Sequence, residues 1–386
     1  MDKRTFCAIL LLTGIFFVNF VARTVPAPLM PTMEAELGLD HMQAGALFLY
    51  LSGGYFLALF FSGFLSAVST HRRVIQVSAA GVGASMILAS ASRDLWFLRG
   101  SFALLGLFAG LYLPSGVSVI TGMVEKKRWG LALAVHEAAP NASFVAAPLV
   151  VHALLSRVDW PMIFLFVGLF SLFFCLLFSR FTAQGGFPGR APGMGALKEL
   201  AKKPGFWVTA GLFSLGITGT LGIFNMLPLY LVADRGVDPA AANLLVSASR
   251  VSGLVMALFA GWVVDRVGPG RSMGAVFLLS GGCAFAMGAA KGPLFWAAVF
   301  LQPAAAVCFF PAGFVALSGL GGEQERNLAV SAAVPPAFLV GAGLVPVFLG
   351  AMAGAGRFSM GMSLVGVFMG LGVLAARKAP NPRAMP

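Results

Sequence analysis

Long apolar runs recur throughout this chain, and they constrain its fold more than any other feature. A helix that crosses a membrane needs about 20 apolar residues, and twelve runs bounded by charges, glycines or prolines are long enough. We expect helices near residues 5–31, 42–69, 73–92, 95–123, 129–156, 160–181, 205–233, 240–264, 272–290, 293–319, 327–355 and 358–376. The sequence therefore predicts an all-α membrane protein of twelve transmembrane helices, with no soluble catalytic domain.

The longest polar stretch divides these helices into two sets of six. It runs from Thr182 to Gly205 and is rich in glycine and proline, then in lysine. We predict an N-terminal six-helix bundle over residues 1–181, a cytoplasmic linker over 182–204, and a C-terminal six-helix bundle over 205–386.

Lysines and arginines indicate the orientation of the helices, because cytoplasmic loops keep positive charge during insertion. If both termini are cytoplasmic, eighteen of the 26 basic residues lie in inner segments, five lie in outer loops, and Arg23, Arg99 and Arg250 lie within predicted helices. The formal charge of +12 is then a topology signal, with no basic, aromatic-rich stretch for a nucleic acid. We expect a multi-pass monomer in a bacterial-type cytoplasmic membrane, in contact with lipid.

The two halves repeat when the chain is shifted by 198 residues. This shift aligns residues 38–73 with residues 236–271 and pairs Gly38 with Gly236 and Asp40 with Asp238. Both copies span the second helix of their half and end at a basic loop. Duplication of six helices is typical of secondary transporters, in which the substrate site lies near the membrane midplane between the halves.

The sequence contains none of the residue patterns that would indicate a metal site, a disulfide framework or an enzyme. The four cysteines show no C-x-x-C spacing, so neither a disulfide framework nor a metal site is predicted. No nucleophile elbow, phosphate-binding loop or H-E-x-x-H motif is present. We expect no cofactor and no enzymatic activity.

The segment GWVVDRVGPGR, which starts at Gly261, resembles the G-x-x-x-D-R-x-G-x-R/K loop signature of the Major Facilitator Superfamily. The resemblance implies a secondary transporter in which Asp265, Arg266 and Arg271 act as a cytoplasmic latch in the outward-facing state. Gly261 would allow close helix approach. A charged loop tip that only anchors topology is the alternative.

The first-half copy of this signature, GFLSAVSTHRR, is degenerate. Ala67, Val68 and Thr70 replace the family's Asp, Arg and Gly, although Arg72 and Arg73 remain as gating candidates. The family's arginine in the fourth helix falls at Phe102, and Arg99 lies one helical turn earlier.

Arginines inside the predicted helices give the clearest indication of a substrate. Arg23 and Arg250 both fall within about 5 Å of the expected midplane at ~1.5 Å rise per residue. Of the 14 acidic residues, Glu137 alone lies well inside a predicted helix, so positive charge is in excess there. A planar guanidinium suits a carboxylate, sulfonate or phosphate, and an anion clamped by both arginines would supply the missing charge. Structural pairing of an arginine with Glu137 or with backbone carbonyls is the alternative.

His136 and Glu137 form a second constellation in the fifth predicted helix. Histidine titrates near physiological pH and a membrane-embedded carboxylate can bind a proton, so either residue is a candidate for proton coupling. Sodium coupling stays open. For His136, a packing role is the alternative.

Four further polar side chains could hydrogen-bond a substrate or simply cross-link helices. They are Asn19, Asn141, Asn225 and Tyr230.

Together these features predict a secondary active transporter that moves a small organic anion, with monocarboxylate-like substrates favoured, by alternating access and with proton coupling. Within the superfamily, the arginine in the eighth helix is similar in position to the anion-binding arginine of monocarboxylate transporters. The alternative is a polyspecific exporter of drugs or amphiphiles.

Overall fold

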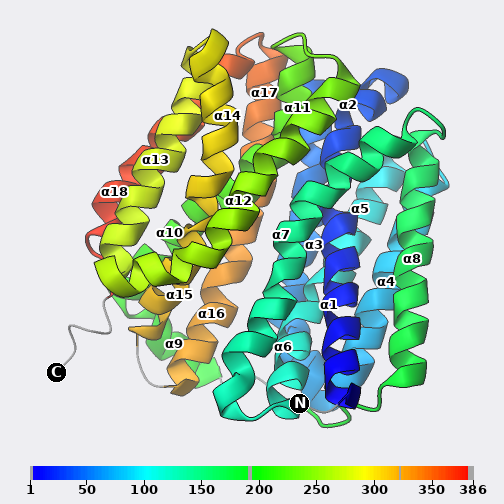
Figure 1. Ribbon diagram of the computed structural model, residues 1–386, viewed down its shortest axis with the longest axis vertical. Coiled ribbons are helices and arrows are strands. Elements are labelled where there is room, and N and C mark those ends of the chain that lie inside the picture. Colours follow the sequence, from blue (N-terminus) through cyan, green and yellow to red (C-terminus); the bar gives the residue numbers. More distant parts are fainter. Residues whose placement is uncertain (1–2, 190–193, 321–322, 381–386) are drawn as a thin grey trace. The chain divides into compact units, whose positions relative to one another are not determined.

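The computed structural model describes residues 3–189, 194–320 and 323–380, and these residues form helices and connections without strands (Figure 1). The α-helices are α1 (Lys3–Thr24), α2 (Pro26–Leu37), α3 (His41–Val68), α4 (His71–Ser90), α5 (Leu95–Gly110), α6 (Tyr112–Met123), α7 (Trp129–Leu154), α8 (Trp160–Phe181), α9 (Met194–Ala201), α10 (Pro204–Ile217), α11 (Ile223–Ala233), α12 (Pro239–Val267), α13 (Pro269–Ala289), α14 (Gly292–Val307), α15 (Phe309–Ser318), α16 (Glu323–Phe338), α17 (Val345–Gly354) and α18 (Phe358–Ala376). A 3-10 turn, η1 (Lys126–Arg128), and two π-helices, η2 (Thr218–Gly222) and η3 (Leu339–Leu344), complete the chain.

All twelve predicted helical runs are present, five of them as consecutive segments. Eleven are long and apolar enough to cross a membrane within the described residues. The twelfth, α7, has 26 residues but carries His136, Glu137 and Asn141. The predicted fold class of an all-helical membrane protein is confirmed.

The described residues of 3–37 and 50–189 form one compact unit, here called the N unit. Figure 1 shows α1 between α7 and α8. Its core gathers apolar side chains from several helices, including Leu12, Phe16, Phe20 and Tyr112. The first helix ends at Thr24 and α2 begins at Pro26, so the chain breaks directly after Arg23, where the prolines were expected to kink it.

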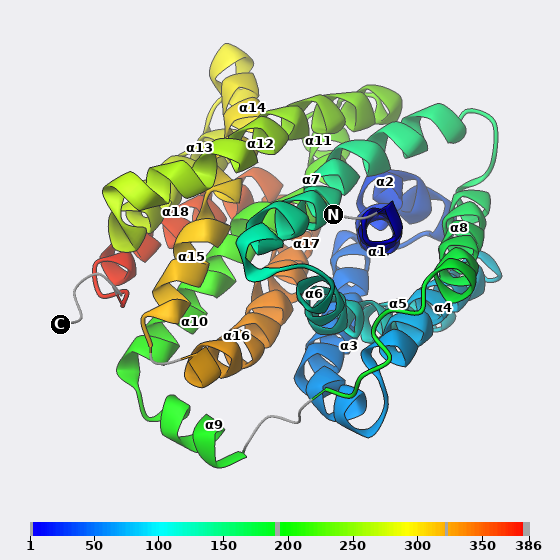
Figure 2. The same ribbon diagram turned by 60° about the horizontal axis from the view of Figure 1, so that its bottom comes forward.

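The described residues of 38–49, 194–320 and 323–380 form the second unit, here called the C unit. Its most extensive helix pair is α13 against α18, which lie side by side in Figure 2. Glycines allow this approach: a Cβ at Gly366 would lie 2.3 Å from the backbone nitrogen of Phe285. Small residues are the usual means by which membrane helices pack closely.

The sequence repeat has a structural counterpart at the start of the second helix of each half. Gly38 and Gly236 both have a φ of 64°, in the left-handed region that glycine adopts without strain. Two residues later an aspartate caps the helix: Asp40 accepts from the backbone N–H of Gln43 at 2.7 Å, and Asp238 from that of Ala241 at 3.1 Å.

The two π-helices were not predicted from the sequence. Residues 218–222 widen the helix between α10 and α11, and residues 339–344 widen the one between α16 and α17. They pack on each other, and a Cβ at Gly222 would lie 2.3 Å from the carbonyl oxygen of Gly341. π-Helical turns are rare and are frequent at functional sites.

The start of the predicted linker packs against the N unit. Backbone N–H groups of His71 and Arg72, in the first turn of α4, donate to the carbonyls of Phe187 and Gly185 at 3.2 and 2.8 Å. Residues 182–189 therefore cap α4. Residues 190–193 of the predicted linker lie outside the described residues, and the predicted domain boundaries stay a prediction.

Candidate functional site

Arg23 lies at the C-terminal end of α1, buried to 4% exposure. Its guanidinium carbon sits 3.9 Å from the ring centroid of Tyr55 in α3 and 4.4 Å from that of Phe20. Cation–π stacking of this kind orients the plane of a guanidinium. Its carboxylate-binding N–H groups project from the edge of that plane, away from the two faces.

Asn19 is one helical turn before Arg23 and is also buried. Its amide Nδ2 donates to the carbonyl oxygen of Ala109 in α5 at 3.1 Å, which ties α1 to α5. Its buried Oδ1 has no hydrogen-bond partner among the described residues. Its predicted role in substrate binding stays a prediction.

His136 and Glu137 of α7 form a second group of polar side chains in the N unit, besides Asn19 and Arg23. Nδ1 of His136 lies 3.1 Å from Oε1 of Glu137, and Nε2 lies 3.1 Å from the hydroxyl of Tyr112. The His136 ring is fully buried and stacks on Phe16 at 4.3 Å, whereas the Glu137 side chain is 53% exposed. Asn141 donates to the backbone carbonyl of Glu137 at 3.3 Å.

The C unit holds Arg250 in α12 at 5% exposure. Its guanidinium carbon lies 4.6 Å from the ring centroid of Phe224, and Nη1 donates to the carbonyl oxygen of Thr220 at 3.2 Å. Thr220 belongs to the π-helix η2, whose i to i+5 bonding shifts its carbonyls out of the ordinary α-helical pattern.

Two more polar side chains of the C unit bond to carbonyls of the π-helices. Asn225 donates to Ala342 in η3 at 3.1 Å, and Gln302 donates to Gly219 in η2 at 2.7 Å. Arg250, Asn225 and Gln302 therefore all donate to carbonyl groups of the two π-helices. The Oδ1 atom of Asn225 is buried and has no hydrogen-bond partner among the described residues.

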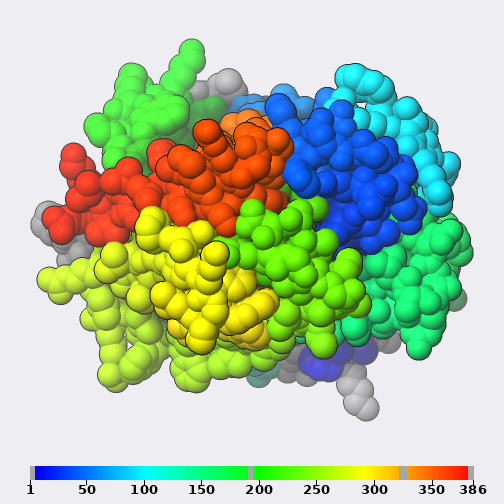
Figure 3. All heavy atoms as spheres, turned by 90° about the horizontal axis from the view of Figure 1, so that it is seen from above, coloured from blue at the N-terminus to red at the C-terminus, as the bar shows by residue number. Residues whose placement is uncertain are grey.

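Tyr230 lies at the opposite end of α11 from η2, and its hydroxyl is engaged by the protein. It donates to the carbonyl of Met287 at 2.7 Å, contacts Ser359 at 2.9 Å and accepts from Arg235. Figure 3 shows the three segments that meet here, coloured yellow-green, yellow and orange-red, side by side. These contacts satisfy the hydrogen-bonding groups of the Tyr230 hydroxyl within the protein. A substrate role for Tyr230 stays a prediction.

Comparison with known proteins identifies the family. The family model of the Major Facilitator Superfamily matches residues 12–240 and 220–385. The chain belongs to the Major Facilitator Superfamily. Its apolar helices, eleven of them long enough to cross a membrane within the described residues, agree with this membership in a family of multi-pass membrane proteins.

Individual relatives of this superfamily member differ in what they do. Membrane sensor protein UhpC of Salmonella typhimurium is 24% identical over 67% of this chain and 63% of its own length. Multidrug resistance protein MdtG of Yersinia enterocolitica is 23% identical over 68% of this chain and 66% of its own length. The chain thus spans slightly less than two thirds of each of these relatives.

Solved structures share the fold at low sequence identity. A bacterial homologue of the human lysosomal transporter Spinster, inward-facing and unoccupied, has a TM-score of 0.82 at 16% identity, covering 98% of both chains. A POT family transporter in complex with 5-aminolevulinic acid has a TM-score of 0.79 at 13% identity, covering 94% of both chains.

The superfamily signature lies at the junction of α12 and α13. A Cβ at Gly261 would meet no described atom within 4 Å, and the expected close helix approach at Gly261 stays a prediction. Gly261 lies on an exposed face of α12 and therefore leaves room for a larger residue. Asp265, Arg266 and Arg271 are exposed, with Arg266 stacked on Trp262 at 4.2 Å. Their latch function stays a prediction.

The two basic residues of the degenerate first-half signature differ in their surroundings. Nη2 of Arg72 donates to the carbonyl oxygen of Ser179 at 2.8 Å, which ties α4 to the end of α8. Arg73 is exposed. Arg99 lies in the second turn of α5, stacked on Trp96 at 4.4 Å.

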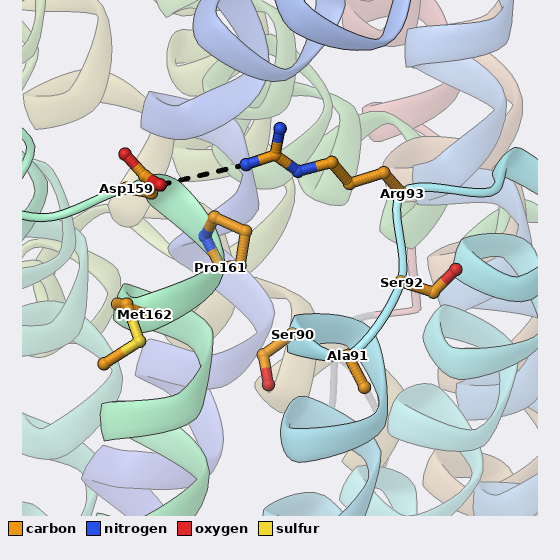
Figure 4. A pocket seen from close by; sticks show the side chains of 7 residues that line it. All are labelled: Ser90, Ala91, Ser92, Arg93, Asp159, Pro161 and Met162. Atoms are coloured by element: carbon orange, nitrogen blue, oxygen red, sulfur yellow. Dashed lines mark ion pairs between the residues drawn. The ribbon is translucent and has the colours of Figure 1, made fainter.

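A polar cluster in the N unit, which was not predicted, joins α2, the α4–α5 loop and the start of α8. Arg93 lies 3.9 Å from Glu36 and 3.8 Å from Asp159, and Trp160 donates to Glu36 at 2.9 Å. Figure 4 shows Arg93 and Asp159 beside a cavity of about 390 Å³. It is lined by Ser90, Ala91, Ser92, Arg93, Asp159, Pro161 and Met162.

A metal-dependent site is not formed by the part of the chain that the structure describes. No three His, Cys, Asp or Glu side chains gather there as ligands of an ion would.

Proposed function

We propose that this transporter moves a small organic anion of the carboxylate class across the membrane by alternating access, together with protons. The observation that carries the proposal is one buried arginine in each unit, Arg23 and Arg250, at 4% and 5% exposure. Intramembrane charges are costly and by default functional. An anion is the ligand that two such arginines favour.

The charge balance supports an anion over a cation or a neutral ligand. Glu137 is the one acid well inside a predicted membrane helix, and its carboxylate contacts His136. We therefore assign the acid to proton binding and each arginine to the anion. A bound anion would offset the charge of the arginines, and their stacking on rings would present guanidinium edges to it.

The His136–Glu137 contact supports proton coupling. An imidazole nitrogen and a carboxylate oxygen 3.1 Å apart can hold a proton between them, and we assign this role to the pair. The exposure of Glu137 would allow proton exchange. Asn19, Asn141 and Asn225 are proposed as further substrate contacts, and Tyr230 as a weaker one because its hydroxyl has protein partners.

The relatives named for multidrug resistance favour a second candidate, a polyspecific exporter of drugs or amphiphiles. Aromatic rings beside both arginines would suit such ligands. The two candidates differ in what the arginines do. An anion carrier requires their charge and planar shape, whereas an exporter of cationic amphiphiles does not.

The test combines binding with transport. Purified protein is screened by thermal shift against small carboxylates, sulfonates, phosphates, nitrate and a set of cationic dyes, because a ligand of the folded state raises the melting temperature. Uptake of the best anion is then measured in proteoliposomes. We expect Arg250→Lys and Arg23→Lys to reduce uptake by about 10- to 100-fold, since lysine cannot form the bidentate contact.

Arg99→Lys is the matched control, because Arg99 lies near a helix end and should tolerate the change. Wild-type uptake kinetics in Arg250→Lys, or stabilisation by dyes and by none of the anions, would overturn the anion assignment.

Proton coupling is tested separately. Glu137→Gln should abolish accumulation driven by a pH gradient, while Glu199→Gln, at an exposed acid of α9, should not.

A further inference from the structure

The hydrogen bonds around His136 determine where its protons lie. The hydroxyl of Tyr112 in α6 is 2.7 Å from the carbonyl oxygen of Leu12 in α1 and 3.1 Å from Nε2 of His136. On the other side of the ring, Nδ1 faces Oε1 of Glu137 at 3.1 Å. These three contacts form one chain from α1 through α6 to α7.

Tyr112 has a single proton to donate. A backbone carbonyl can only accept, so the short contact to Leu12 requires the tyrosine proton. At His136 the tyrosine oxygen must then accept, and Nε2 must carry a hydrogen. Tyr112 thereby selects one of the two neutral tautomers of the imidazole.

With a hydrogen on Nε2, a neutral His136 presents a lone pair at Nδ1. An ionised Glu137 also presents only lone pairs, and two acceptors do not hold a 3.1 Å contact. One more proton must lie between them, on either atom. The pair is then neutral overall, and after loss of that proton it carries one negative charge.

We propose that His136 and Glu137 bind a single proton as one unit, and that Tyr112 is the positioning residue that makes this proton necessary for their contact. The inference rests on the proton coupling proposed above and deepens it. Loss of the proton turns the contact repulsive, so the exposed Glu137 side chain separates from His136, whose ring stays stacked on Phe16.

The surroundings of the ring contain few other titratable groups. His136 touches Phe16 of α1, Tyr112 of α6 and Glu137 of its own helix. Tyr112 and Glu137 are the titratable groups that face it. Because Tyr112 also bonds to Leu12, the proton site is joined to α1, the helix that carries Asn19 and Arg23.

Nitrogen NMR of histidine-labelled protein in nanodiscs tests the tautomer without any substrate. The chain has four histidines, and His136→Gln identifies the signal. At high pH we expect the Nε2-protonated tautomer in the wild type. In Tyr112→Phe the imidazole is free to donate from Nδ1 to Glu137, so the Nδ1-protonated tautomer should replace it. An Nδ1-protonated neutral His136 in the wild type would overturn the proposal.

The pH dependence of uptake provides the second measurement. In Tyr112→Phe the deprotonated pair is no longer repulsive, because Nδ1 of His136 can carry the hydrogen and donate to Glu137. The protonated pair loses the tyrosine oxygen that accepts from Nε2–H. Both changes weaken proton binding. We expect the pH midpoint of uptake in Tyr112→Phe to move about one unit to lower pH. Tyr50→Phe, at a half-buried tyrosine of α3 whose ring centroid lies 5.5 Å from the guanidinium carbon of Arg99, should leave the midpoint unchanged.

The outcomes separate the two proposals. An unchanged or raised midpoint in a folded Tyr112→Phe protein contradicts the positioning role, as do two separate proton-binding steps at His136 and Glu137 across the pH range of transport. If Tyr112→Phe does not fold, the wild-type tautomer still decides. If the wild type shows the Nε2-protonated tautomer but takes up no anion, the proposed transport function is overturned and the role of Tyr112 at His136 stands.

Discussion

The guanidinium carbon of Arg23 lies 3.9 Å from the ring centroid of Tyr55, and this pair joins α1 to α3, the first two helices of the N-terminal half. The C-terminal half also has a cation–aromatic pair between its first and second predicted membrane helices, but there the arginine and the ring are on exchanged helices. There the second helix carries Arg250 and the first carries Phe224, 4.6 Å apart. Each half thus holds one arginine against one ring of the neighbouring helix.

Removing the ring beneath Arg23 should weaken anion binding. We expect Tyr55→Leu to raise the KM for the transported anion by about 2- to 30-fold, the range that a loss of 0.5–2 kcal/mol of cation–π energy gives. Tyr55→Phe keeps the ring and should change KM by less than about threefold. Uptake assays in proteoliposomes measure both, and equal effects of the two changes would rule out a role for the ring.

The cluster at Arg93 allows a buried hydrogen bond to be compared with an exposed ion pair. Trp160 is buried and donates to Glu36, so Trp160→Phe should cost about 1–2 kcal/mol of stability. Arg93 is 58% exposed and its ion pairs are long, so Arg93→Gln should cost under about 0.5 kcal/mol. Thermal melts in detergent show which of the two variants loses more stability. A larger loss in Arg93→Gln than in Trp160→Phe would contradict this account.

Close packing of α13 and α18 depends on particular glycines. A Cβ at Gly366 would lie 2.3 Å from a backbone nitrogen, so Gly366→Ala should lower the melting temperature by several degrees, as overpacking does. Gly370, one turn later on the same helix, has no atom within 4 Å of its Cβ position. Gly370→Ala should therefore leave stability unchanged or raise it. Similar losses in both variants would show that packing is not the cause.

The cap that residues 182–189 place on α4 is testable at two adjacent glycines. Gly185 has a φ of 83°, and its Cβ would lie 2.7 Å from Val119, whereas a Cβ at Gly186 meets nothing within 4 Å. Gly185→Ala should speed hydrogen exchange at the amides of His71 and Arg72, which donate to this segment. Mass spectrometry of the peptide that contains them measures the effect. Unchanged exchange in Gly185→Ala, or equal acceleration in Gly186→Ala, would contradict the cap.

The sequence predicts the fold well because membrane helices are long and apolar, and hydrocarbon allows few alternatives to them. The break after Arg23 follows from prolines, and the matched starts of α3 and α12 follow from the aligned Gly38 and Gly236. These features depend on local chemistry, which is readable from the chain alone.

Features that depend on distant contacts were missed. Tyr112 lies in an apolar run, so the sequence suggests only that its ring packs in the core. Its hydrogen-bond partners Leu12 and His136 are 100 and 24 residues away in the chain, and the sequence does not indicate these contacts. The two π-helices pack against each other at Gly222 and Gly341, which are even further apart in the chain.

The single proton that we propose for His136 and Glu137 would have an energetic consequence for the whole transport cycle. A carrier that moves one proton with each singly charged anion transfers no net charge, so the membrane voltage, worth about 2.3 kcal/mol per charge at 100 mV, does no work on it. The pH difference then supplies about 1.4 kcal/mol per unit and sets the limit of accumulation at about tenfold per unit. Net flux would run toward the alkaline side, and a depolarised cell would reach the same concentration ratio as a polarised one.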